Sequence, residues 1–403
     1  MDLVFRIFER LGWHLSKTDP ALPIVRPSAL ESSPFRELPL ELIYHIASSL
    51  PLESVASLSL SCLHLYSCLT MMYLQPLKKA EYSVMNRFLH LLERDLPAHI
   101  VCPECNKLHY MPFAERHLAS QLYSPVRKDS LKCRIADSKG HYIGGIPGGF
   151  SSTIFRMAMK SHRQGKDTTT LLRLLSYRNL EKYQIGFVEL HTAEARIYHG
   201  SICDSSNCDG SNWNGSNCDG SLFVREQKVF MIPDTEKTPL PWCGGFGICR
   251  HIPLAEMTDL YWWGIRVPQV DEIHGYENKQ GIIYCQHCHT EFRVDFKSYG
   301  KAGNALFITI WMDLGQGRDS NDFKRRIRLD GSERRKKLTY QRGSICAAFE
   351  QNTEFKFDSL LTEKDKKDLR TPSYWSWPIN VTVLGKEVGI GYMVRNGRLV
   401  PKF

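Results

Sequence analysis

The chain has 403 residues, 42% of them hydrophobic and 24% charged, and a formal net charge of +9. This length suits two or three globular domains. No uncharged apolar run reaches the roughly 18 residues of a membrane-spanning helix, so no membrane association is expected. The N-terminus lacks the features of a signal peptide, which predicts an intracellular protein of the cytoplasm, the nucleus or both. In that reducing environment the thirteen cysteines favour metal binding over disulfides.

A linker leads to the first predicted helices. Residues 1–33 form a tail and a stretch rich in proline and serine, and 34–75 predicts three short helices. Pro39 suits the first helical position, Glu41 favours the positive end of the helix dipole, and Pro51 ends the helix. Helices this short bury too little surface to be stable alone, so their apolar face requires a partner. In the first helix that face consists of Leu42, Ile43, Ile46, Ala47 and Leu50.

The sequence Leu-Pro-x-Glu-Leu at 38–42, followed by Leu50-Pro51 and by Leu-Ser-Cys at 60–62, resembles an F-box. In that family the segment binds a Skp-type adaptor and, through it, the cullin of an SCF-type ubiquitin ligase. The resemblance implies that 34–75 is the F-box and that 76–403 is a substrate-binding region. The adaptor-binding residues that it implies are Leu38, Pro39, Glu41, Leu42, Ile46 and Leu50.

After the F-box the apolar pattern changes from helical to strand spacing. Helices are predicted within 78–96, at 151–163 and at 168–178. From about residue 183 the hydrophobic period is two, which predicts strands. These strands are expected at 184–191, 195–202, 222–232 and 305–314, with a C-terminal hairpin at 381–384 and 388–394.

Two polar segments interrupt this pattern. Residues 203–221 contain a near-repeat of Ser-Asn-Cys-Asp-Gly-Ser with almost nothing to bury, which predicts a flexible insert. Residues 318–337 carry nine Lys and Arg against four Asp and Glu. We interpret this basic segment as a solvated loop, with nuclear import and nucleic-acid binding as alternatives.

Two Cys-x-x-Cys pairs carry the clearest chemical signal. Two residues between the sulfurs let the chain turn and present both thiolates to one ion, and zinc takes four such ligands in a tetrahedron. The sequence therefore predicts a structural zinc ion bound by Cys102, Cys105, Cys285 and Cys288. Three further residues remain open as substitutes or as parts of a second site, namely Cys249, His251 and His109. The predicted fold class is α+β, with a three-helix F-box before a mixed, largely β domain that holds the zinc and a few helices.

The spacing of these residues is similar to that of a group of filamentous-fungal F-box proteins whose substrates are unassigned. The similarity rests on Cys-x-x-Cys-x-x-x-His at 102–109, Cys-x-His at 249–251 and Cys-x-x-Cys-x-Thr-Glu-Phe at 285–292. It implies no activity beyond the F-box.

Three hypotheses of function follow. The first is a non-enzymatic, substrate-recruiting subunit of a cullin-based ubiquitin ligase, with an unknown protein as its target. The second is a zinc-containing nucleic-acid-binding protein that uses 318–337. The third is an enzyme in which His289 or Glu291 beside a zinc ion activates water, although a four-cysteine site is closed to water.

Overall fold

Contacts divide the chain into two compact units, Met1–Met111 and Pro112–Phe403, which we call the helical unit and the sheet unit. The structure is a computed structural model of the whole chain. The predicted insert, except for Gly220 and Ser221, and the basic segment, except for Lys337, lie outside the described residues. The described residues are 38–102, 105–117, 150–182, 188–198, 220–232, 246–249, 251–254, 278, 281–300, 303–317, 337–351, 353–370, 379–383, 386–390, 392–395 and 398–401.

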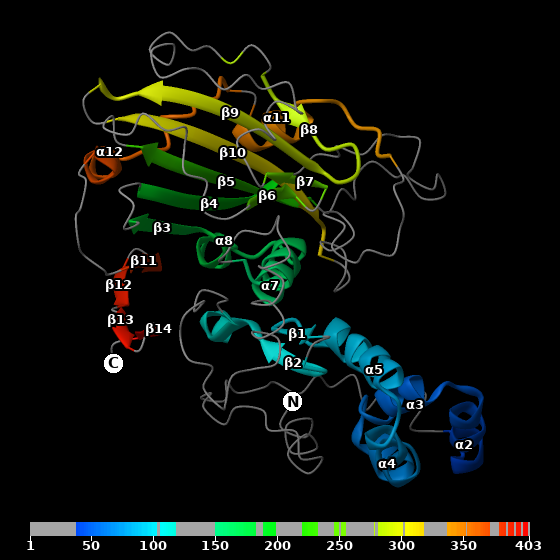
Figure 1. Cartoon of the computed structure of the whole chain (residues 1–403). Helices are drawn as coiled ribbons and strands as arrows, with labels where there is room; N and C mark the ends of the chain where they lie inside the picture. The colour runs from blue at the N-terminus through cyan, green and yellow to red at the C-terminus, as the bar shows by residue number, and fades with distance from the viewer. Residues whose placement is uncertain are drawn as a thin grey trace. The chain divides into compact units, whose positions relative to one another are not determined.

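The described part of the helical unit consists of four helices and a two-stranded hairpin (Figure 1). Pro39 is the residue that precedes the first helix rather than its first residue, and Pro51 likewise precedes the second. The thiol of Cys62 accepts a hydrogen bond from the Leu65 backbone N–H and caps the third helix. In chain order the elements are α2 (Leu40–Ser49), α3 (Leu52–Ser59), α4 (Leu63–Lys78), α5 (Tyr82–Asp95), β1 (His99–Cys102) and β2 (Lys107–Tyr110).

Two apolar clusters hold the helical unit together. The first joins α2, α3 and α4 through Ile43, Ala47, Val55, Leu65 and Leu69. The second joins α3, α4, α5 and β1 through Ala56, Leu74, Leu77, Met85, Phe88, Leu89, Leu92 and Val101. The helix predicted within 78–96 is therefore confirmed as α5, and its apolar face lies in the second cluster.

An eight-stranded sheet with the order β12-β11-β3-β4-β5-β10-β9-β8 is the centre of the sheet unit. Every neighbouring pair in it is antiparallel. Its strands are β3 (Tyr177–Lys182), β4 (Val188–Tyr198), β5 (Ser221–Ile232), β8 (Ile283–Tyr284), β9 (Thr290–Ser298), β10 (Asn304–Gly315), β11 (Ile379–Val383) and β12 (Lys386–Ile390). Separate two-stranded pairs are β6 (Phe246–Cys249) with β7 (Ile252–Leu254) and β13 (Tyr392–Arg395) with β14 (Arg398–Pro401).

Short helices pack on this sheet (Figure 1). The sequence-predicted helices at 151–163 and 168–178 are α7 (Ser152–Arg163) and α8 (Thr169–Leu175), which contact β5 and β4. α11 (Ser344–Glu350) packs against the sheet through a cluster that includes Phe223, Trp311 and Phe349. The segment between α11 and α12 (Glu363–Arg370) contributes Phe357 and Leu361. These two side chains pack against Val229 and Phe307 of the sheet. The η3 turn (Met111–His117) spans the boundary of the two units.

The predicted strands at 222–232 and 305–314 are confirmed as β5 and β10, but the pair predicted at 184–191 and 195–202 is wrong. One continuous strand, β4, runs through the expected turn, and β3 begins within the last two residues of the helix predicted at 168–178. β4 pairs with β3 on one side and with β5 on the other, so its backbone groups are satisfied without a turn. Overall, helices precede a sheet-rich region with some helices, as an α+β chain requires.

None of the helices in the described part of the chain has the length and hydrophobicity that crossing a membrane requires.

Candidate metal centre and docking surface

Four side chains that could hold a metal ion converge in the sheet unit from two separate turns. Cys249 ends β6 and His251 immediately precedes β7, so the tight β6–β7 hairpin presents both. Cys285 and Cys288 lie in the turn between β8 and β9. Three sulfurs and one imidazole nitrogen lie within 4.8 Å of one another. We call this set the β6–β9 group.

The β6–β9 group suits zinc by its chemistry and its burial. Three thiols and one imidazole form a closed, tetrahedral ligand set of the Cys3His type. Cys249 and Cys285 are 2% exposed and Cys288 is fully buried. These cysteines do not form disulfides, so their thiols remain available as metal ligands.

The β8–β9 turn has the hydrogen bonds of a metal knuckle. The Cys285 N–H donates to the Thr290 carbonyl over 2.9 Å, and the Thr290 N–H donates to the Cys288 carbonyl over 2.8 Å. The His287 N–H points at the Cys285 sulfur over 3.4 Å. Backbone N–H groups of this kind orient thiolate ligands and offset their charge.

Hydrogen bonds between the thiols of the β6–β9 group shift their pKa values in different directions. Hydrogen bonds with Cys249 and Cys288 lower the pKa of Cys285 far below its ordinary value. Hydrogen bonds with Cys285 and Cys288, together with burial, raise the pKa of Cys249. A cation bound by the group would take the place of the thiol protons.

The structure groups the metal-binding residues differently from the first-choice prediction of a single site. Cys285 and Cys288 find their partners in Cys249 and His251, the pair that the sequence left in reserve. Cys102 and Cys105 group instead with the remaining reserve residue, His109, on the β1–β2 hairpin. The correction has a simple physical reason: spacing identifies each knuckle, but only tertiary packing decides which second turn faces it.

Tyr340 and Glu291 connect the β8–β9 turn to α11. The Tyr340 hydroxyl lies 3.2, 3.3 and 3.0 Å from the carbonyl oxygens of Cys285, Cys288 and Thr290. The Glu291 carboxylate accepts the Gly343 N–H over 2.7 Å and the Cys346 N–H over 2.9 Å, at the start of α11. Burial raises the pKa of Glu291 while these N–H groups oppose the shift. Both carboxylate oxygens thus accept hydrogen bonds at the start of α11, a structural role for Glu291 that the enzyme hypothesis does not include.

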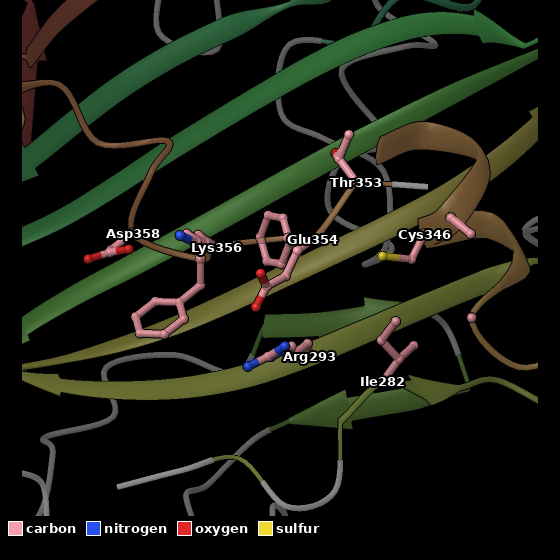
Figure 2. A pocket seen from close by; sticks show the side chains of 11 residues that line it. Ile282, Arg293, Cys346, Thr353, Glu354, Lys356 and Asp358 are labelled. Atoms are coloured by element: carbon pink, nitrogen blue, oxygen red, sulfur yellow. The ribbon is translucent and has the colours of Figure 1, made fainter. Parts of the chain in front are cut away.

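A pocket of about 540 Å³ lies beside α11 (Figure 2). Arg293 of β9 lies on one side of it, and Glu354, Lys356 and Asp358 from the segment after α11 line the other. Arg293 pairs with Asp295 over 2.8 Å. The apolar lining of the pocket includes Ile282, Ala347, Phe355, Phe357 and the thiol of Cys346. Burial raises the pKa of Cys346 to about 12, so this thiol is a protonated, apolar contact rather than a nucleophile.

In the helical unit, α2 has two different faces. Ile43 and Ala47 are buried, whereas Leu42, Ile46 and Leu50 are 49%, 37% and 38% exposed. Among the six residues that the F-box resemblance implies, Pro39 and Glu41 are also exposed. Leu38 differs, because it is half-buried and packs against the cluster of α2, α3 and α4. The apolar face expected from helical spacing is therefore divided between core and solvent.

No protein-family model, curated protein or solved structure matches this chain.

Proposed function

We propose that the protein is a substrate-recruiting subunit of a cullin-based ubiquitin ligase, and that the exposed face of α2 binds a Skp-type adaptor. The supporting observation is the exposure of large apolar side chains. Leu40, Leu42 and Ile46 lie on α2 and Leu50 is its C-cap residue, and all four side chains are more than a third exposed. Several large apolar side chains exposed on one short segment of a small unit indicate an interaction surface.

Two methionines of the same unit add further exposed apolar surface. Met71 and Met72 on α4 are 75% and 55% exposed. Methionine is flexible and polarisable, so it adapts to a partner surface at low cost. The sheet unit would then bind the target protein, and the pocket beside α11 offers it an apolar floor between charges of both signs.

Replacement of Leu42 and Ile46 by aspartate tests the adaptor proposal. Both side chains are exposed, so the double variant should fold, while two desolvated charges in the interface should reduce adaptor co-purification by more than tenfold. Tyr82→Ser is the matched control, because Tyr82 is an exposed apolar residue of the same unit outside α2. Undiminished binding of a Skp-type adaptor and cullin by the folded double variant would refute the assignment.

We also infer that the β6–β9 group binds one structural zinc ion, as its Cys3His ligand set and burial support. When bound, the ion would supply a cross-link between two turns, and a closed ligand set leaves it no position for catalytic water. Elemental analysis of the purified chain tests this inference. The Cys285→Ser variant should contain about one equivalent of zinc less than the unaltered protein.

A nucleic-acid-binding role remains the second candidate from the sequence. Its basic segment lies outside the described residues apart from Lys337, and no structural observation favours it.

A further inference from the structure

The β1–β2 hairpin of the helical unit brings together two cysteines and a histidine. Cys102 ends β1 and pairs with Lys107 of β2, and His109 lies two residues further along β2, on the same face. Between the strands, Asn106 has a φ of 51°, a left-handed conformation that asparagine tolerates in tight turns. The two sulfurs and an imidazole nitrogen lie within 4.8 Å of one another.

These three donors are shielded from solvent. Cys102 is 2% and His109 is 7% exposed, and Cys105 is half-buried. Two thiols separated by two residues, followed by an imidazole, form a soft ligand set that selects zinc over magnesium or calcium.

We propose that the β1–β2 hairpin is a second metal site, which binds its own zinc ion through Cys102, Cys105 and His109. The β6–β9 group already has four donors and does not need the hairpin cysteines. The two groups also belong to different compact units, the helical unit and the sheet unit. The protein therefore carries one zinc ion in each unit, and the proposal is independent of the adaptor role.

The surroundings of the hairpin explain what the second ion does. A two-stranded hairpin of four-residue strands is marginal by itself. Here the Val101 N–H donates to Glu93 of α5 over 3.2 Å, and the Val101 side chain lies in the core cluster that α5 shares with α3 and α4. A zinc ion that closes the turn fixes the end of β1, and through Val101 it supports the packing of α5.

Among the described residues, the three donors of the hairpin fill three of the four positions of a tetrahedral zinc ion.

Zinc content measured on the purified full-length chain and on single variants tests the proposal. The unaltered protein should contain about two equivalents, and His109→Ala and Cys285→Ser should each contain about one. The double variant should contain almost none. Cys68→Ser is the control, because Cys68 is a half-buried cysteine of the helical unit outside both groups, and it should retain about two equivalents.

Two measurements distinguish the loss of a metal ligand from misfolding of the variant. His109→Cys restores a third soft donor, so it should recover the zinc that His109→Ala loses. Substitution by Co²⁺ adds an optical signal, because charge-transfer absorption grows with the number of coordinated thiolates and should fall in Cys105→Ser. One equivalent in the unaltered protein that His109→Ala leaves unchanged would overturn the proposal but not the β6–β9 site. A single equivalent lost in either variant would show one shared ion, and a Cys102–Cys105 disulfide in the native protein would exclude the second ion.

Discussion

Tyr340 is a single residue on which the geometry of the β8–β9 turn depends. Its hydroxyl faces three carbonyl oxygens of the turn, its ring stacks on His289 at 5.5 Å, and the Tyr284 ring meets its edge at 5.5 Å. Burial raises the pKa of Tyr340 well above its ordinary value, so the phenol stays protonated and always has a proton to donate.

Tyr340→Phe should weaken the zinc knuckle while leaving its ligands in place. The substitution keeps the ring and removes the hydroxyl, which should cost about 1–3 kcal/mol because the turn loses one buried hydrogen-bond donor. We expect lower thermal stability and faster transfer of zinc to a chelator. Tyr284→Phe is the control, since it alters a neighbouring tyrosine that contacts the Tyr340 ring. Equal zinc-transfer rates for the unaltered protein and the Tyr340 variant would show that the hydroxyl does not support the turn.

At the scale of one element, α2 offers a direct comparison of core and surface. Ile43 and Ile46 are one turn apart on the same helix, but Ile43 is 1% exposed and packs in a cluster, whereas Ile46 faces solvent. Truncation of a buried isoleucine removes contacts and leaves a cavity, while truncation of an exposed one does neither.

Ile43→Ala should therefore lower the free energy of unfolding by about 2–5 kcal/mol, and Ile46→Ala by less than about 0.5 kcal/mol. Chemical denaturation followed by circular dichroism measures both. Adaptor binding should show the reverse order, with Ile46→Ala the more damaging at a temperature where both variants are folded. Similar losses of stability in the two variants would mean that the division of α2 into two faces is incorrect.

Element types were easier to predict than element ends, for reasons visible in particular segments. The helices α7 and α8 and the strands β5 and β10 have regular apolar periods, so the sequence predicts them well. The sequence predicts two strands where the structure has β4. The buried residues Leu190, Ala193 and Ala195 do not keep the strict alternation of a single strand. Ladders on both sides keep it continuous, and such tertiary pairing leaves no local signal. The C-terminal hairpin is confirmed as β11 and β12, but the strand predicted at 388–394 is divided between β12 and β13, which belong to different sheets.

At the scale of the whole molecule, the candidate metal ligands are predictable from the sequence, but the way in which they group is not. All seven cysteines and histidines chosen from spacing occur in one of the two groups. The pairing of Cys285 with Cys249 requires the β6–β7 hairpin to pack against β9, and that contact depends on how the whole sheet unit folds. The hydrogen bonds from the start of α11 to Glu291 could not be predicted either, because the donors are distant from Glu291 in the sequence.

Because each unit holds one metal group, loss of one ion should destabilise only the unit that bound it. In Cys288→Ser, loss of the ion should release two turns and, through Glu291 and Tyr340, loosen α11. Hydrogen–deuterium exchange should therefore rise in β6–β9 and α11 and stay unchanged in α2–α5, and adaptor binding should persist. Cys105→Ser should give the opposite pattern, with faster exchange in β1, β2 and α5.

Cys346→Ser separates metal loss from the cost of burying a hydroxyl. Cys346 is a buried cysteine of α11 that belongs to neither metal group, so its variant should retain both ions. A buried, poorly paired hydroxyl costs about 1–3 kcal/mol, and exchange should rise mainly around α11. If Cys288→Ser instead increased exchange in α5 and β1, one ion would be tying both units together. Confinement of each effect to its own unit requires separate metal centres, because a shared ion cannot be lost from one unit alone.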